Sequence, residues 1–345
     1  PLSAALNNNV CMIVVFNNFN VQTSKYMPLI KTARLAKLKF FSKLLFVFAI
    51  FNIVSYTIKI ADINDFKTDF AVRNLIKSAY NAVALFPEKF IASNINRGAS
   101  RPSIFFVAEE SDRIIGCNAF MANDFLLDGK GYIGYQSCWS VTDPLHQGKG
   151  IFSGLINEAK KILGADGATF IFGIANDKSN PIITKKLGFV ETPAQVLRIP
   201  NIPFLKKIYF TNKALQNNNG ACFINEKQLM EHKLIQYPSA IRKVEYNSSW
   251  LWGKLEYKKK YGIKWLVFYV GGVELSDEKD LKVLVSKIFE LYKVSFVQFF
   301  SCKTNTVNRL MRGWRKPNMN GFIYFNLSMP DFKHFNCMLG AIDIF

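Results

Sequence analysis

The sequence has few residues that bind metals or form disulfides, and those it has are scattered. Its three histidines show no ligand-like spacing: His146, His232 and His334. Its six cysteines include no Cys-x-x-Cys pair: Cys11, Cys117, Cys138, Cys222, Cys302 and Cys337. Structural zinc sites and disulfide frameworks need paired spacings. We therefore predict no metal site and a reducing, cytoplasmic location.

Acidic residues are absent from the first 61 positions, which hold seven Lys and Arg residues. Residues 44–51 form an apolar run of eight, too short to span a bilayer as a continuous helix. The basic stretch before this run resembles a signal sequence, but it lies far from residue 1 and lacks a convincing small-residue cleavage site. We expect residues 1–54 to be an extension outside the main fold. The alternative is a helix at a membrane interface, without firm membrane association.

Positive charge is uneven in the rest of the chain. Residues 62–199 hold 15 basic and 14 acidic side chains, whereas residues 200–345 hold 22 and 11. A nucleic-acid binder is expected to concentrate charge in one module with interleaved aromatics, and no such motif occurs, so we predict no specific nucleic-acid partner. The basic segment either attracts an anionic acceptor, such as a phosphorylated or nucleotide-linked sugar, or reflects a compositional bias of the surface.

The most informative stretch runs from Tyr132 to Val190. Residues 132–141 alternate as a strand does, Pro144 ends the strand, and Gly148 and Gly150 precede a helical pattern of apolar residues: Ile151, Leu155, Ile156, Ala159, Ile162 and Leu163. A helix that begins in this way leaves main-chain N–H groups unpaired at its positive end, which favours a bound phosphate. The glycine spacing matches neither a P-loop nor a dinucleotide fingerprint.

The segment Gln147-Gly148-Lys149-Gly150-Ile151 resembles the acyl-CoA signature of the GNAT acetyltransferase superfamily, which cradles the diphosphate of coenzyme A. A second matching part follows at the expected distance: a strand over 170–175, a loop over 176–180, a short helix over 181–187, and Gly188-Phe189. The resemblance implies an α/β fold with a mixed sheet. It also implies an N-acyltransferase that uses acetyl-CoA and a small amine acceptor by direct transfer.

The resemblance also implies the residues that bind the cofactor. They are the strand segment Trp139, Ser140 and Val141, the turn residues His146, Gln147, Gly148, Lys149, Gly150, Ile151 and Phe152, and the loop residues Asn176 and Asn180. The main chain of residues 139–141 would bind the pantetheine arm. We expect His146 to be a loop residue that faces solvent, with a diphosphate contact as the alternative.

Two positions depart from the family pattern and bear on the chemistry. Phe152 stands where members usually carry Gly or Ala, and Thr184 stands where many carry a Tyr that protonates the departing thiolate. For the acid and base we consider Thr184, Glu109, Glu110, Asp124 and Asp343. Cys138 is either a nucleophile for an acyl-enzyme or, as we favour, a small strand residue.

The remaining pattern divides the chain into an extension (1–54), a GNAT domain (55–200) and a C-terminal half (201–345). In the second segment we predict strands at 56–61, 103–109 and 113–121, and helices at 66–79 and 87–95, with Tyr80, Phe86 and Phe90 as candidate wall residues of the acceptor site. A linker follows at 193–220. The third segment has strands at 263–270, 295–301 and 322–327 and helices at 277–292 and 306–311.

The order of elements in the third segment echoes the first domain, and we interpret it as a smaller, degenerate GNAT-like half. The alternative is a generic α/β substrate domain. Its turn at residues 271–275 lacks the signature, and Glu274 would repel a phosphate. Two alternatives to an acetyltransferase stay open: an aminoacyltransferase that uses charged tRNA, and a non-catalytic acyl-CoA binder that regulates a partner. The sequence predicts no oligomeric state.

Overall fold

The computed structural model describes residues 56–81, 84–95, 98–202, 210, 222–223, 226–302, 305, 307–311, 314–317, 321–328, 335, 337 and 338. These residues belong to one compact unit, Tyr56–Phe345. The predicted extension, most of the predicted linker and Asp343 lie outside the described residues. None of the helices in the described ranges has the length and apolar character that crossing a membrane requires.

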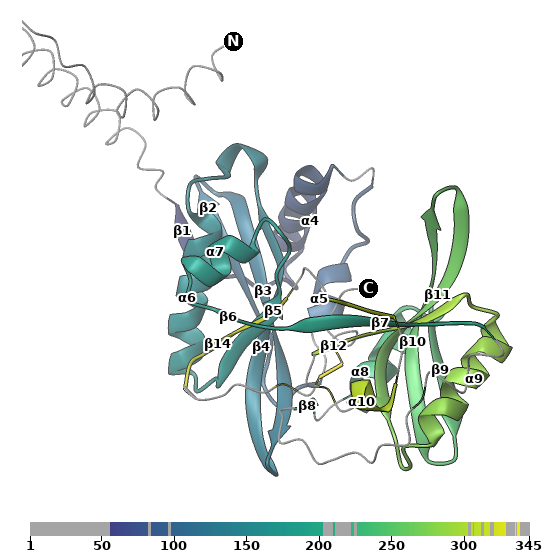
Figure 1. Ribbon diagram of the computed structural model, residues 1–345. Coiled ribbons are helices and arrows are strands. Elements are labelled where there is room, and N and C mark those ends of the chain that lie inside the picture. The colour runs from purple at the N-terminus through teal and green to yellow at the C-terminus, as the bar shows by residue number, and fades with distance from the viewer. Residues whose placement is uncertain are drawn as a thin grey trace, which may run out of the picture. The chain divides into compact units, whose positions relative to one another are not determined.

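The first sheet has eight strands among the described residues (Figure 1). Seven of them lie side by side in this order: β1 (Thr57–Ile60), β2 (Ile104–Glu110), β3 (Arg113–Leu127), β4 (Lys130–Thr142), β5 (Phe170–Ile174), β14 (Phe322–Asn326) and β6 (Val190–Thr192). The eighth, β8 (Cys222–Phe223), pairs with the far end of β3. The β4–β5 pair is parallel and the others are antiparallel, so the sheet is mixed, as predicted.

Helices cover both faces of this sheet. Helix α6 (Ile151–Ala165) packs an apolar stripe that includes Leu155 and Ala159 on one face, beside Phe106 and Ile171. Helices α4 (Phe66–Tyr80) and α5 (Phe90–Ile95) pack on the residues that point the other way, such as Val107. The short helices η1 (Pro144–His146) and α7 (Asn180–Lys185) connect strands to helices. The alternation of strand residues between two covered faces explains why β2 to β5 are so apolar.

The second sheet has six strands among the described residues. Their order is β13 (Trp314–Pro317), β7 (Ala194–Pro200), β12 (Phe296–Cys302), β11 (Ile263–Glu274), β10 (Ser249–Lys260) and β9 (Ile241–Tyr246). Helix α9 (Asp280–Tyr292) buries Leu281, Leu284 and Ile288 in a core with the strand residues Phe268 and Phe299. Helices α8 (Glu226–Gln236) and α10 (Val307–Leu310) complete this part.

Each sheet contains strands from both halves of the sequence, and the two sheets share one core. Strand β7 follows the first domain in sequence but lies in the second sheet, whereas β14 comes from the C-terminal half and lies between β5 and β6 of the first sheet. One apolar cluster joins Phe170 and Phe172 of the first sheet to Trp252 and Phe300 of the second. The predicted boundary at residue 200 therefore does not divide the chain by sheet, and the domain limits stay a prediction.

Two features predicted after residue 190 are corrected. Residues 271–274 are not a turn before a helix but the last part of β11, where Gly272 pairs with Trp252 of β10. Part of the predicted linker is strand β7, and the hairpin of β9 and β10 was not predicted at all.

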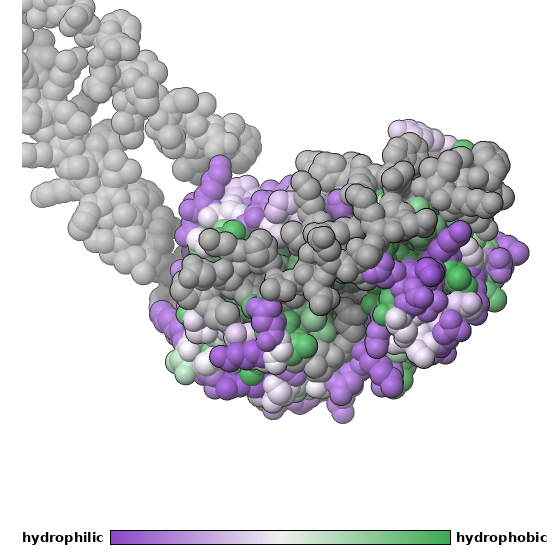
Figure 2. Space-filling model, turned by 60° about the horizontal axis from the view of Figure 1, so that its bottom comes forward, coloured by the Kyte–Doolittle hydropathy of each residue, from purple (hydrophilic) through white to green (hydrophobic). Residues whose placement is uncertain are grey.

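In the space-filling view, hydrophilic residues dominate the rim of the molecule and hydrophobic residues form small patches between them (Figure 2).

Candidate active site

Strands β4 and β5 separate partway along their length. They pair only from Gly134 opposite Phe170 to Gln136 opposite Phe172. Beyond that point β4 continues to Thr142, while the next residues of β5 pair with β14 on the other side. A bulge between β3 and β4 accompanies the separation, and Trp139 at this bulge has a left-handed backbone, with φ of 53°. A bulge bends its strand and redirects side chains, so a gap opens beside residues 137–142.

The glycine turn leads from η1 into α6 with its main chain exposed. Gly148 and Gly150 both have φ of 81°, a conformation that L side chains rarely adopt, and Gly150 is the N-cap of α6. No side chain caps this helix, and the first main-chain bond of its first turn runs from Gly154 N–H to Gly150 O. In this described region, the N–H groups of residues 151–153 therefore have no acceptor. They stand at the positive end of a 15-residue helix.

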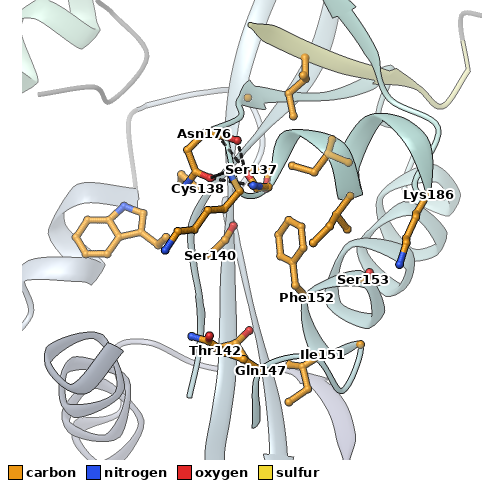
Figure 3. A pocket seen from close by; sticks show the side chains of 18 of the residues that line it. Ser137, Cys138, Ser140, Thr142, Gln147, Ile151, Phe152, Ser153, Asn176 and Lys186 are labelled. Carbon is orange, nitrogen blue, oxygen red and sulfur yellow. Dashed lines mark hydrogen bonds between the residues drawn. The ribbon is translucent and has the colours of Figure 1, made fainter. Parts of the chain in front are cut away.

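A cavity of about 680 Å³ lies at this helix end and runs along the gap between the strands. Its wall is formed by Tyr80, Gln136, Ser137, Cys138, Trp139, Ser140, Thr142, His146, Gln147, Gly148, Gly150, Ile151, Phe152, Ser153, Gly173, Ile174, Asn176, Lys178, Ser179, Ile182, Ile183, Lys186 and Ile323. Ser140 on β4 and Phe152 on α6 approach it from opposite sides (Figure 3). Among the described residues, the wall contains the cations Lys178 and Lys186 and no carboxylate.

Most of the predicted cofactor residues meet at this cavity. Trp139, Ser140, His146, Gln147, Gly148, Gly150, Ile151, Phe152 and Asn176 line it, whereas Val141, Lys149 and Asn180 do not. Val141 is buried in the core under α4. Asn180 donates from Nδ2 to Glu191 Oε2 at 3.3 Å. Asn176 Oδ1 accepts from the N–H groups of Lys178 and Ser179 at 3.0 and 2.9 Å, so its side chain shapes the loop beside the cavity.

His146 is not the solvent-facing residue that the sequence suggested. It is 9% exposed, with Nδ1 3.2 Å from Asp143 Oδ1 and Nε2 3.0 Å from Glu110 Oε2. The sequence did not reveal this because Glu110 belongs to β2, far back along the chain. The imidazole therefore ties the glycine turn to the end of the β2–β3 hairpin.

Asp143 organises the start of the same turn. Its Oδ1 accepts from Leu145 N–H at 2.8 Å, and its Oδ2 accepts from Arg113 Nη2 at 2.5 Å. Burial raises the pKa of Asp143, but the Leu145 amide, His146 and Arg113 together outweigh it and leave the pKa below its usual value. A charged Asp143 therefore stabilises the turn that precedes Gly148 and Gly150.

Three of the predicted acid and base residues, Glu109, Asp124 and Thr184, are not among the described residues of the cavity wall. Glu109 pairs with Lys59 across β1 and β2. Asp124 accepts from the main chain and hydroxyl of Ser100 at 2.9 and 2.6 Å. The Thr184 hydroxyl donates to the main-chain oxygen of Asn180 at 2.8 Å. Asp343 lies outside the described residues.

The cavity also has wall residues that sequence reasoning missed. Ser137 and the two cations Lys178 and Lys186 line it, although none was a predicted site residue. Their positions in the sequence could have identified them. Ser137 is on the strand before the glycine turn, and the two lysines are on the loop and after the helix of the second part that matches the family pattern. Cys138 also lines the cavity, and its Sγ lies 3.7 Å from Ala119 O.

Comparison with known proteins agrees with this geometry. Residues 73–191 match the model of a family described as an acetyltransferase (GNAT) domain, and this range contains the glycine turn and the cavity wall residues from Gln136 to Lys186. The search of curated proteins found no match.

Several solved structures have a similar fold. A GCN5-related N-acetyltransferase from Anabaena variabilis aligns with 10% identity over 79% of this chain and 73% of that chain, with a TM-score of 0.55. A protein from Enterococcus faecalis described as a probable N-acyltransferase aligns with 12% identity over 79% and 72%, with a TM-score of 0.55. Eis1 from Mycobacterium abscessus aligns with 12% identity over 79% and 74%, with a TM-score of 0.51. At these identities the likeness shows the fold, and it extends over both sheets.

Proposed function

We propose that this chain, whose residues 73–191 match an acetyltransferase (GNAT) domain, transfers an acetyl group from acetyl-CoA to the amine of a small molecule. Transfer is direct, within a complex of both substrates. An amino sugar or nucleotide-linked sugar is the acceptor class that the basic C-terminal half suggests. The GNAT part spans residues 55–200, and residues 201–345 supply a second half without a CoA turn of its own. The free cysteines among the described residues fit a cytoplasmic location.

The observation that carries this proposal is the uncapped start of α6 at the cavity. The main-chain N–H groups of residues 151–153 donate no hydrogen bond within the described part of the chain. A Cβ atom added at Gly148 or Gly150 would have no neighbour within 4 Å. A diphosphate has the charge and size to use this space, as phosphates do at other helix N-termini. Lys178 and Lys186 on the cavity wall add charge of the matching sign.

The rest of the cofactor follows the gap between the strands. The pantetheine arm would run beside residues 137–140, with main-chain groups near Trp139 and Ser140 as its partners. The thioester carbonyl would then lie near the main chain of Val141 and Thr142, where an N–H group polarises it. Lys149 and Asn180, which stand outside the wall, are assigned to the rim of the site.

The transfer itself needs few charged groups. The amine nitrogen attacks the carbonyl carbon, the new C–N bond forms, the C–S bond breaks and its electron pair leaves on sulfur. The ammonium then loses a proton and the thiolate gains one. With no carboxylate on the described wall, water carries the proton to a more distant base, for which Glu109, Asp124 and Asp343 remain candidates. Positioning of the two substrates supplies most of the acceleration.

One observation favours a different class of function. The Thr184 hydroxyl donates to the main-chain oxygen of Asn180, and Thr184 does not line the cavity. The residue at the position where many family members carry the acid is therefore not placed to protonate a thiolate. A protein that binds acyl-CoA without turnover and regulates a partner would need no acid. Thr184 is therefore assigned no role in the proposed transfer.

Calorimetric titration with acetyl-CoA, followed by a thiol-release assay over a panel of amines, tests the proposal. Binding with release of free thiol on at least one amine supports it. Binding without turnover on any amine would favour the regulator. If acetyl-CoA does not bind, the proposal is contradicted, and the alternative function, an aminoacyltransferase that uses charged tRNA, is favoured.

A further inference from the structure

The end of the hairpin formed by β10 and β11 extends past the rest of the second sheet (Figure 1). Among the described residues, β9 pairs with β10 only as far as Lys254, and β12 pairs with β11 only from Val267 onward. Between these limits residues 257–260 and 263–266 pair with one another in regular register. At about 3.4 Å a residue, these four pairs give a two-stranded ribbon that projects by roughly 13 Å.

This ribbon carries charge of one sign. Residues 257–273 hold four lysines and no Asp or Glu. The acid that precedes them, Glu256, lies 3.1 Å from Lys258 Nζ and 3.6 Å from Lys254 Nζ, so two cations share it. The ribbon therefore keeps a net positive charge after this acid is counted.

Two of the lysines face each other without an acid between them. Lys259 and Lys264 are directly opposite in the register, so their side chains leave the same face of the ribbon. Both are exposed, and no acid among the described residues forms an ion pair with either. The end of α9, the helix that covers this face of the sheet, adds the exposed Glu290 and the exposed Lys293, whose charges cancel. Like charges directly opposite destabilise a strand pair, and an anion bound between them removes that cost.

The ribbon also exposes large apolar side chains near its turn. Tyr261 is 89% exposed, Tyr257 is 67% exposed and Ile263 is 55% exposed. On the other face the Trp265 ring packs against the Phe296 ring, with centroids 5.5 Å apart. Because an isolated two-stranded hairpin is only marginally stable, this contact anchors the ribbon to the sheet. Three exposed apolar side chains gathered at one projecting end form a contact surface.

The combination of these side chains fits a lipid bilayer better than a nucleic acid. A bilayer offers phosphate groups for the lysines, an interface that Tyr favours, and hydrocarbon beneath for Ile263. A nucleic acid would use the lysines, but it offers polar edges and flat rings in place of an apolar layer for Ile263. We name these five residues the ribbon end: Tyr257, Lys259, Tyr261, Ile263 and Lys264.

We propose that the ribbon end docks the protein reversibly on a lipid bilayer whose headgroups are anionic. Two lysines and three apolar side chains supply much less binding free energy than a spanning helix, so the docking depends on salt and is not a firm association. The proposal is independent of the acetyl transfer, because the ribbon end belongs to the second sheet and the cavity lies beside α6. It gives part of the basic C-terminal half a role apart from the acceptor.

The first test measures the charge by co-sedimentation of the full chain with vesicles. Vesicles of phosphatidylcholine mixed with phosphatidylglycerol are expected to bind the protein at low salt, and vesicles of phosphatidylcholine alone are not. The double variant Lys259→Gln/Lys264→Gln should lower the partition coefficient about thirtyfold, the effect of two basic side chains at an anionic surface. Lys259→Arg/Lys264→Arg should keep the wild-type value.

The matched control removes two exposed lysines from α8 and α9, in Lys227→Gln/Lys282→Gln. Its partition coefficient should stay within about twofold of the wild type, because these charges lie away from the contact. Thermal melting establishes that every variant folds. Equal losses in the two Gln double variants, equal binding to both kinds of vesicle, or binding to neither would overturn the proposal.

The second test separates a bilayer from a nucleic acid. Ile263→Ser should lower the partition coefficient about tenfold, because an apolar side chain no longer enters the interface. Ile235→Ser, which changes an 81% exposed side chain on α8, should leave it unchanged. The same variants are titrated with a short single-stranded RNA. RNA binding that needs the two lysines but not Ile263, without binding to phosphatidylglycerol vesicles, would assign the ribbon end to nucleic acid and contradict docking on a bilayer.

Discussion

His146 Nε2 lies 3.0 Å from Glu110 Oε2, which joins the turn before Gly148 and Gly150 to the end of strand β2. The other ring nitrogen lies 3.2 Å from Asp143 Oδ1. Carboxylate oxygens only accept hydrogen bonds when ionised, so both contacts are hydrogen bonds when the ring carries both protons. The ring therefore links the glycine turn to two carboxylates, Asp143 and Glu110.

The first prediction concerns Glu110. The substitution Glu110→Gln removes the charge that faces His146. We expect acetyl-CoA to bind about three- to tenfold more weakly. A hydrogen bond to a charged group contributes roughly 1.5–3 kcal/mol, and only part of that free energy stabilises the conformation of the turn. Glu109→Gln is the matched control, since Glu109 is the neighbouring residue of β2 and pairs with Lys59 instead. Calorimetry on both variants decides the matter, and equal affinities would refute the coupling.

The second prediction concerns the pH dependence of folding through Asp143. The folded-state pKa of Asp143 is below its usual value, so the stabilisation is fully present above the unfolded pKa of about 4 and is lost as pH falls through the folded value. We expect the free energy of unfolding of the wild type to fall more steeply in acid than that of Asp143→Asn. Urea unfolding at pH 6 and at pH 3 measures this, and parallel curves would contradict it.

The third prediction concerns Lys160 on α6. Its ammonium lies 3.6 Å from the centre of the Phe325 ring and donates to Leu187 O, and burial lowers its pKa to about 8. Between that value and the usual 10.5 the unfolded state binds more protons, so this residue makes stability rise with pH.

Lys160→Met should therefore remove part of the rise in unfolding free energy between pH 8 and pH 10. Lys161→Met is the control, because Lys161 is 73% exposed and pairs only with its neighbour Glu158. Thermal unfolding across this range is the measurement. An unchanged slope in Lys160→Met would show that the lysine stays charged throughout.

Local patterns were sufficient to predict the elements that position the cofactor site. The strand that ends at Pro144, the glycine turn and the amphipathic helix after it depend on neighbouring residues, and all are present. The family resemblance then assigned residues such as Gln147 and Asn176, which line one cavity. Short-range rules of this kind hold because turn and helix starts are fixed by a few adjacent dihedral angles.

Long-range pairing could not be predicted in the same way. The apolar and aromatic residues of 322–327 predict a strand but not its place between β5 and β6. That place depends on partners more than a hundred residues earlier. Residues 193–220 predict a linker because they hold Pro, Lys and an Asn-Asn-Asn-Gly run, yet pairing with β12 and β13 makes residues 194–200 a strand. The burial of His146 likewise depends on Glu110, which no local pattern brings near.

The most direct test of the whole account compares two glycines with the same backbone. Gly150 at the start of α6 and Gly262 at the tip of the β10–β11 hairpin have φ of 81° and 79°, and a Cβ at either would meet nothing within 4 Å. Gly150→Glu and Gly262→Glu therefore strain the chain equally, but only the first puts a carboxylate where the diphosphate would lie. We predict that calorimetry with acetyl-CoA shows no binding to folded Gly150→Glu and wild-type affinity for Gly262→Glu. Wild-type affinity in Gly150→Glu would contradict the account.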